Sequence, residues 1–218
     1  MDDLLRFNFG QRYLSFDTET EGLNLINDRP FQLAWQLSTV KGEIQTGNRL
    51  IRWPDLKMSA DAAKITRFDR GLYDQSSIDP KEAWNEFKKI LYDPSVVLIC
   101  QNFFNFDVYM LRRLQIEAGE KPDFSYMRRI VDTKCVATAI KKGLPFNPQV
   151  DKDFLAWQYR VGSIVEKGLK TSLITLLKEY EIPVDESRLH EALYDVQMMF
   201  EVFKKMIWKV EIPNLAVY

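Results

Sequence analysis

Alternating apolar and polar residues predict strands in the first quarter of the chain. Between residues 31 and 39 the large apolar side chains fall on every second position, the pattern of a strand with one buried face. Further strands are predicted over residues 12–17 and 43–53, with Lys41 and Gly42 as a tight turn into the last one. Three strands joined by short connections predict an antiparallel meander.

Helical spacing and one apolar run mark the rest of the chain. Asp79 as N-cap and Pro80 at the first helical position predict a helix that ends before Pro94. The wholly apolar run Val96–Cys100 is typical of a strand buried on both faces, and residues 129–132 predict a last strand. Apolar residues at helical spacing predict further helices over residues 106–119, 133–141, 172–180 and 191–209. This order predicts an α/β fold with a mixed five-stranded sheet, antiparallel in its first three strands and then parallel, flanked by helices.

Length and composition favour one core-forming domain. The chain has 218 residues, of which 46% are hydrophobic and 28% charged, and no repeat or linker-like stretch divides it, so a single domain over residues 1–218 is predicted. Residues 142–170 are an extended connection, either a lid or binding loop or an embellishment packed on the core. No apolar run is long enough to cross a bilayer and the start is not signal-like, so we expect no membrane association and a cytoplasmic location.

Charge and cysteine content exclude some classes. The chain has 30 basic and 31 acidic residues, which argues against a protein that coats duplex DNA but leaves room for one that grips a strand end. Cys100 and Cys135 are the only cysteines, and both stand in apolar surroundings. We interpret them as buried packing residues in a reducing compartment rather than as a disulfide or zinc site.

Two carboxylates stand at the end of the first predicted strand. Asp17 and Glu19 are two residues apart, so in a strand they project from the same face. Two adjacent acids in an apolar stretch repel each other, and a bound divalent cation would remove that cost. Carboxylates without a nearby histidine or cysteine suit magnesium or manganese. An equally supported alternative is that the strand has ended and both acids are solvated.

Two further acids fall on apolar helical stripes. Asp107 begins the stripe that continues through Met110 and Leu114, which predicts an inward position, although a helix dipole would also favour an acid there. Asp195 lies in an apolar stripe of the last helix, which is apolar on its opposite side as well. His190, the only histidine, comes just before this helix. Its placement near Asp195 favours a proton-transfer role over an ordinary structural one.

Taken together, these segments resemble the DEDDh family of 3′→5′ exonucleases. The stretch from Phe16 to Leu23 is similar to the family's first motif, and Asn102 to Asp107 to its second. His190 and Asp195, with four residues between them, match the third motif in its histidine form. The surroundings of this third motif resemble the proofreading exonuclease subunit of bacterial DNA polymerase III.

The resemblance implies a fold, a mechanism and a set of site residues. The fold would be ribonuclease H-like, with two divalent cations, Mg²⁺ or Mn²⁺, held by Asp17, Glu19, Asp107 and Asp195. His190 would take the proton from the attacking water, and the products would be 5′-mononucleotides. The resemblance also implies substrate-binding residues near the 3′ nucleotide: Thr18, Thr20, Leu23, Asn102 and Phe106. Leu23 and Phe106 are apolar and have core packing as an alternative.

Substrate and partner follow less directly. The likeness to the polymerase subunit favours single-stranded DNA with a free 3′ end, and an exoribonuclease that trims RNA 3′ ends is the alternative. A DNA polymerase or other replication or repair partner is compatible with it, although no docking motif is visible. A third hypothesis is a non-catalytic nucleic-acid-binding or polymerase-docking module, which would have no need of inward acids.

The second motif and residues 142–170 depart from the family pattern, whereas Asp132 and Thr133 fit it. Gln101 stands where many relatives carry histidine, and an extra residue separates Asn102 from Phe106, so Asn105 is an alternative helix cap. Residues 142–170 are longer than the matching connection in the polymerase subunit. Asp132, before Thr133, is interpreted as a structural helix cap rather than a metal ligand.

Overall fold

A mixed five-stranded sheet lies at the centre of the computed structural model, which describes residues 4–216. The strand order is β3-β2-β1-β4-β5. β1 pairs antiparallel with β2 and β2 antiparallel with β3, whereas β4 pairs parallel with β1 and β5 parallel with β4. The predicted mixed sheet is therefore confirmed. Its strands are β1 (Arg12–Thr20), β2 (Pro30–Thr39), β3 (Gly42–Leu50), β4 (Val96–Cys100) and β5 (Ile130–Asp132).

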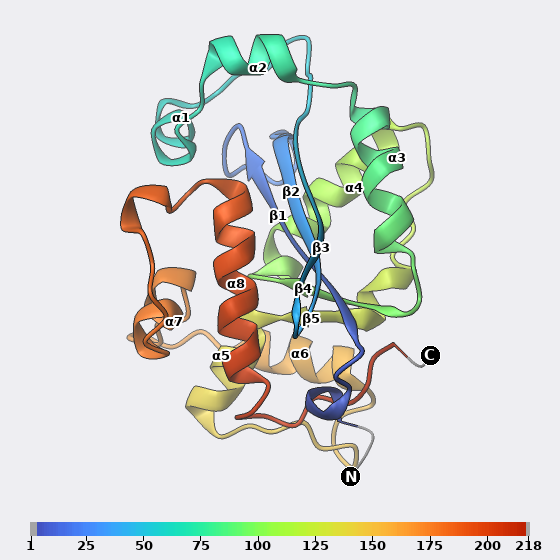
Figure 1. Ribbon diagram of the computed structural model, residues 1–218, viewed down its shortest axis with the longest axis vertical. Coiled ribbons are helices and arrows are strands. Elements are labelled where there is room, and N and C mark those ends of the chain that lie inside the picture. Colours follow the sequence, from blue (N-terminus) through green and yellow to red (C-terminus); the bar gives the residue numbers. More distant parts are fainter. Residues whose placement is uncertain (1–3, 217–218) are drawn as a thin grey trace.

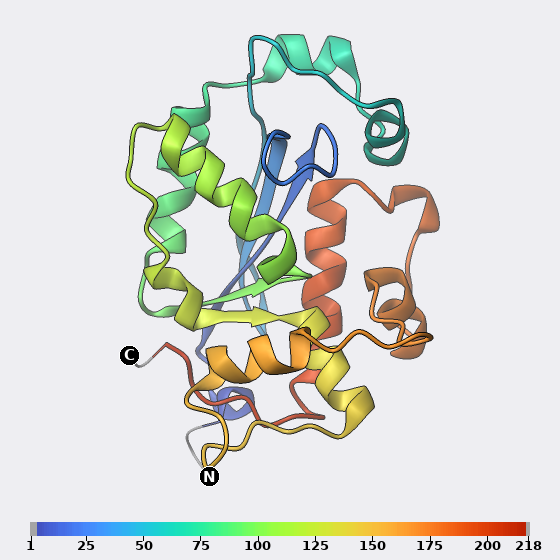
Figure 2. The same cartoon turned by 180° about the vertical axis from the view of Figure 1, so that it is seen from behind.

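Helices cover both faces of the sheet. Helices α3 and α4 lie on one side, and α5 and α8 lie on the other (Figures 1 and 2). The helices are α1 (Ala60–Thr66), α2 (Arg70–Ser76), α3 (Pro80–Leu91), α4 (Asp107–Glu117), α5 (Thr133–Lys142), α6 (Phe154–Gly162), α7 (Leu173–Glu179) and α8 (Ala192–Met206). Short 3₁₀ turns are η1 (Leu5–Phe7), η2 (Phe103–Asn105), η3 (Ser125–Arg129) and η4 (Glu186–Arg188). No helix within residues 4–216 is long and apolar enough to span a membrane.

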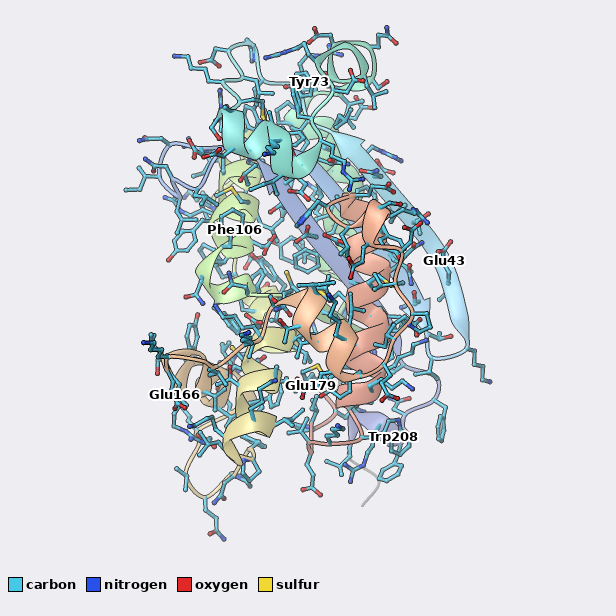
Figure 3. All side chains as sticks on the ribbon, turned by 90° about the vertical axis from the view of Figure 1, so that its left-hand side faces the viewer. Glu43, Tyr73, Phe106, Glu166, Glu179 and Trp208 are labelled. Atoms are coloured by element: carbon cyan, nitrogen blue, oxygen red, sulfur yellow. The ribbon has the colours of Figure 1, made fainter. Side chains whose placement is uncertain are left out.

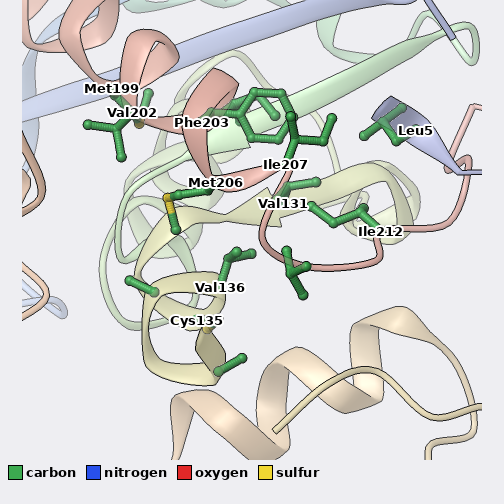
Figure 4. Packing of buried hydrophobic residues seen from close by; sticks show 14 of the residues in the cluster. Leu5, Val131, Cys135, Val136, Met199, Val202, Phe203, Met206, Ile207 and Ile212 are labelled. Atoms are coloured by element: carbon green, nitrogen blue, oxygen red, sulfur yellow. The ribbon is translucent and has the colours of Figure 1, made fainter. Parts of the chain in front are cut away.

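Side-chain alternation on β1 divides the core into two clusters. The Tyr13 ring packs against Phe200 and Phe203 of α8, with ring centroids 5.6 and 5.3 Å apart. Phe16 points to the opposite face and packs against Phe87 of α3 at 5.4 Å. The cluster on the side of Tyr13 and α8 is called the α8 cluster. Figure 4 shows part of it, where side chains of α8, α5 and β5 meet Leu5 and Ile212 from the terminal segments. Two buried faces explain why β4 is wholly apolar.

The connection over residues 142–170 contains α6, which covers the free edge of β5. Trp157 and Phe154 are buried in the α8 cluster. The Gln158 side chain accepts a hydrogen bond from Asp132 N (2.8 Å) and donates one to Ile130 O (2.9 Å), so it occupies the backbone groups that an edge strand leaves free. For this helix, the structure favours the embellishment packed on the core over the lid.

Helices α1 and α2 were not predicted from the pattern. They belong to an arm, residues 54–76, that extends beyond the end of the sheet (Figure 1). Ser59 and Asp69 cap the two helices, and Tyr73 anchors the arm because its hydroxyl donates to Ile51 O and accepts from Trp53 N. α1 has no buried residue, so its sequence carries no apolar stripe to reveal it.

Segments from the two ends of the described chain meet at the opposite end of the molecule from the arm (Figure 1). Leu5 N donates a hydrogen bond to Ile212 O at 2.9 Å, and Leu4 forms a bridge with Pro213. Leu5, Ile212 and Leu215 are buried in the α8 cluster. The terminal segments are thus part of the core.

Candidate active site

Asp17 and Glu19 lie within β1, which continues to Thr20. They pair in register with Ala34 and Gln32 of β2, so they are on a strand rather than in a solvated loop, and that alternative is wrong. Alternate residues of a strand share a face, and both side chains are partly buried. The end of β1 therefore presents two carboxylates on one side of the sheet.

Asp107 joins them from the first turn of α4. Its side chain is only 1% exposed, so it is an inward acid and not one that the helix dipole holds in solvent. Its Oδ1 accepts hydrogen bonds from Thr18 N (3.1 Å) and from the Thr18 hydroxyl (2.7 Å). Thr18 lies between Asp17 and Glu19, so this contact fixes Asp107 against the strand that carries the other two acids.

Asp195 and His190 come from the start of α8. Asp195 Oδ2 accepts a hydrogen bond from His190 N at 3.2 Å. Asp195 Oδ1 is buried and has no hydrogen-bond partner within residues 4–216. His190 is exposed and has a positive φ of 70°, which is uncommon for a residue with a side chain. The third segment thus brings an under-satisfied acid and an accessible imidazole to the same place.

Burial raises the pKa of all four acids, and neighbouring acids of the cluster raise the pKa of Asp17 and Glu19 further. Burial, followed by repulsion from Asp107, Glu19 and Asp195, raises the pKa of Asp17 well above its usual value. Burial and the neighbouring Asp195 and Asp107 raise the pKa of Glu19 to about 8. Burial also raises the pKa of Asp107 to about 6, against the opposing hydrogen bonds from Thr18, and that of Asp195. Strongly perturbed carboxylates gathered in one place are typical of a functional site.

The donor set suits a hard divalent cation. All four side chains offer carboxylate oxygens, and Asp195 Oδ1 is a buried acceptor with no donor among residues 4–216. As they stand, no three histidine, cysteine or acidic side chains in the described part of the chain have the arrangement of a closed metal site. The carboxylate oxygens of the four side chains nevertheless fit a hard divalent cation.

The remaining predicted site residues surround this cluster. Leu23, in the β1–β2 loop, is 86% exposed, so it is not a core residue. Phe106 immediately precedes α4 and is partly exposed; Figure 3 shows it on the side of the molecule where α4 and α8 flank β1. Thr20 is buried, and its hydroxyl donates to Gly22 O at 2.5 Å. Leu23 and Phe106 thus remain accessible, whereas the hydroxyls of Thr18 and Thr20 make internal bonds.

The loop before α4 is organised by Asp132. As predicted, Asp132 caps α5 by accepting from Lys134 N (2.9 Å), and it also accepts from Asn102 N at 2.9 Å. Asn102 Oδ1 accepts from Asn105 Nδ2 (3.0 Å) and from Lys134 Nζ (2.8 Å). Neither asparagine caps α4, because Phe106 occupies the N-cap position. Asp132, at the end of β5, and Lys134 of α5 thus hold the loop of the second motif in place.

Two contacts at the site had no signal in the sequence. Gln101, at the position where many DEDDh relatives carry histidine, donates to Thr171 O at 2.7 Å and ties β4 to the segment before α7. Glu21, the third acid of the first motif, is buried and pairs with Arg29 (Nε to Oε1, 2.7 Å), while Lys57 N donates to its Oε2. Glu21 therefore fastens the loop of Leu23 to the arm. Both links join residues that are far apart in sequence.

Comparisons with known proteins decide the family. A family model for exonucleases, RNase_T, matches residues 14–203. The chain belongs to this exonuclease family. It is of the DEDDh 3′→5′ type, so the resemblance noted in the sequence is confirmed.

Two relatives show how much of each protein this exonuclease chain matches. It is 23% identical to a PolC-type DNA polymerase III of Ureaplasma parvum. The alignment spans 194 residues, which make up 89% of this chain and 11% of the polymerase. The zinc-bound complex of E. coli exonuclease I with single-stranded DNA has a TM-score of 0.69 and 18% identity, over 89% of this chain and 40% of that one. Exonuclease I in complex with a dT13 oligonucleotide gives 0.68 and 16%, over 91% and 41%. These similarities confirm the ribonuclease H-like exonuclease fold.

Proposed function

We propose that the protein is a metal-dependent 3′→5′ exonuclease that hydrolyses phosphodiester bonds at a nucleic-acid 3′ end and releases 5′-mononucleotides. The observation that carries the proposal is the meeting of Asp17, Glu19, Asp107 and Asp195, from three segments, with His190 beside Asp195. Burial and repulsion from neighbouring acids raise the pKa of Asp17 and Glu19, a cost that a bound cation would offset. A merely structural module would not retain it.

Asp17, Glu19, Asp107 and Asp195 would together hold two divalent cations, Mg²⁺ or Mn²⁺. Bound cations would supply the positive charge that stabilises the phosphate and the leaving 3′ oxygen. The raised pKa values support this assignment, because a cation favours the ionised form that the neighbouring acids disfavour. Thr18 would keep Asp107 in place through its two hydrogen bonds.

His190 would take the proton from the attacking water. His190 is exposed, and its backbone N–H donates to Asp195 Oδ2 at 3.2 Å, so the residue lies next to one of the four acids. Histidine is the side chain that most often serves as a general base in enzymes.

Single-stranded DNA is the substrate that we favour. Exonuclease I, whose fold this chain shares, has been solved in complex with single-stranded DNA, and the other relative is a DNA polymerase. The same polymerase likeness favours a replication or repair setting. Discrimination between DNA and RNA depends on contacts to the 2′-hydroxyl. Near the 3′ nucleotide we expect contacts from Thr18, Thr20, Leu23, Asn102 and Phe106.

Digestion of end-labelled single strands tests the proposal. Matched DNA and RNA oligonucleotides, labelled at the 3′ or the 5′ end, are incubated with Mg²⁺, Mn²⁺ or EDTA. We expect immediate release of a labelled mononucleotide from the 3′-labelled strand and a shortening ladder from the 5′-labelled strand, both abolished by EDTA. The polymer that is cut faster identifies the substrate. Asp17→Ala, purified in parallel, controls for contaminating nucleases, and a folded protein that cuts neither strand would refute the proposal.

A further inference from the structure

His190 lies on a surface loop that is shaped mainly by its own residues. This His190 loop, residues 185–191, contains η4 and leads directly into α8. Asp185 N donates to the Tyr194 hydroxyl at 2.8 Å, and the Arg188 guanidinium lies 4.4 Å from the centre of the Tyr194 ring. Arg188 also pairs with Glu191 at 3.2 Å. The His190 N–H bond to Asp195 (3.2 Å) and an ion pair between Lys178 and Glu186 (3.1 Å) join the loop to α8 and α7.

One residue of the arm contacts this loop from outside. Arg67, at the end of α1, donates a hydrogen bond from its guanidinium to Ser187 O, 120 residues later in the sequence. The same guanidinium lies 4.0 Å from Glu191 Oε1, next to His190. Arg67 therefore contacts the loop on both sides of the histidine, and Glu191 lies between two arginines, Arg67 and Arg188.

The backbone at Arg67 makes this contact unusual. Arg67 adopts the left-handed conformation, with φ 53° and ψ 40°, at the C-cap of α1. Glycine is the residue that takes this conformation without steric cost, and any side chain there costs free energy. The arginine is 49% exposed, so it does not fill a core position. A strained backbone that carries an exposed side chain is accounted for by what that side chain contacts.

We infer that Arg67 is a positioning residue that clasps the His190 loop to the arm and so holds the imidazole beside Asp195. The inference rests on the proposed function, because it gives His190 its role in the reaction. The clasp also forms part of the wall of a cavity of about 580 Å³, which Arg67, Arg188 and His190 line together with residues of β2 and β3.

Arg67→Gly separates positioning from folding. Glycine removes the clasp and relieves the left-handed backbone, so thermal stability should be unchanged or higher. At the same time kcat should fall, on the order of 10²-fold for a displaced catalytic group, with KM unchanged. Arg67→Lys keeps a donor within reach of Ser187 O and should recover part of kcat. Lys64→Ala, which removes one positive charge from the same arm, should behave as the wild type.

The single histidine provides a readout that needs no substrate. In an untagged protein with labelled histidine, NMR shows the resonances of one imidazole, that of His190. We expect an ordered ring in the wild type and in Lys64→Ala, and a shifted, more mobile ring in Arg67→Gly. If the wild type cleaves no nucleic acid, the proposed function fails on its own, and this comparison still decides whether the clasp exists.

Three results would overturn the inference. The first is an Arg67→Gly protein with unchanged kcat and an unchanged His190 signal. The second is a higher KM at unchanged kcat, which would make Arg67 a cation that binds the strand. The third is a loss of thermal stability in Arg67→Gly that accounts for the lost activity, which would make Arg67 a residue of the fold.

Discussion

The arrangement of the acidic side chains at the site lowers the stability of the folded protein. Asp107 and Asp195 stand close enough to Asp17 and Glu19 to raise the pKa of both, and Asp195 Oδ1 is buried without a donor within residues 4–216. Burying an unpaired acceptor and crowding like charges both destabilise a folded protein. The cost falls when a cation or a proton is bound, so the site is built for an occupied state.

Glu19→Gln should therefore stabilise the metal-free protein while it abolishes cleavage. The substitution removes one negative charge from the cluster at nearly constant volume, so repulsion of Asp195 and Asp107 falls. Thermal unfolding in EDTA, measured near pH 8, should show a higher Tm than for the wild type, and the nuclease assay should show no product. A lower Tm would mean that Glu19 makes a stabilising contact in the metal-free protein.

His190→Ala and Asp17→Ala should differ in their effect on metal binding. Loss of a general base slows catalysis by about 10²–10⁴-fold, whereas the carboxylates that hold the cations remain. Titration of each variant with Mn²⁺, followed by calorimetry, should give nearly wild-type binding for His190→Ala and weakened binding for Asp17→Ala. Full activity of His190→Ala would remove the general-base assignment.

At the scale of elements, α6 shows how an added segment becomes part of the framework of the site. Gln158 bonds both the N–H of Asp132 and the carbonyl of Ile130, at the edge of β5. Asp132 in turn holds Asn102 and the start of α5. α6 thus supports, through one strand, the loop that leads to Asp107.

Replacing Gln158 by Ala leaves two buried backbone groups without partners. We expect the free energy of unfolding to fall by about 1–3 kcal/mol for each buried donor or acceptor that is left unsatisfied. Urea unfolding followed by circular dichroism measures the change. Gln149→Ala, an exposed glutamine of the same connection, should leave the free energy of unfolding unchanged. Equal stability of both variants would show that water replaces the amide.

Helices and strands could be predicted from the sequence where one face is buried and its apolar residues repeat with the period of the element. The apolar run Val96–Cys100 became β4 with its predicted bounds, and Asp79 and Pro80 marked the start of α3 correctly. α1 and α2 were missed because they are seven residues long and bury at most Tyr73. The acids and His190 could be chosen because each one breaks an apolar pattern or completes a motif. Arg67 could not, since its partner Ser187 is near it only in the folded chain.

At the scale of the whole molecule, the acidic cluster couples stability to pH and to metal. Burial and repulsion raise the pKa of Glu19 from 4.5 to about 8, so the folded protein keeps a proton that the unfolded chain has already lost. This contribution to stability is complete below about pH 4.5 and is lost as the pH rises towards about 8. Asp107, whose pKa is raised to about 6, adds to the same trend.

The metal-free protein should accordingly lose thermal stability as the pH rises from about 5 to about 8. Mg²⁺ or Mn²⁺ should reverse the trend, because the cations bind the ionised acids of the folded state. Scanning calorimetry at several pH values, with EDTA and with metal, measures both effects. In Asp17→Ala the difference between the two series should shrink. A Tm that rises with pH in EDTA would contradict the assigned charge states.

The pairing of Leu5 with Ile212 has a consequence for how this unit can be joined to other polypeptides. Because Leu4 and Pro213 form a bridge, the backbone enters and leaves the fold at adjacent points, at the end away from the arm (Figure 1). A unit of this kind can be inserted into a surface loop of a larger host, or carried on a flexible stalk, without stretching its sheet. If the unit were inserted in this way, its arm and His190 loop would face away from the host, and both linkers would lie at the opposite end of the unit.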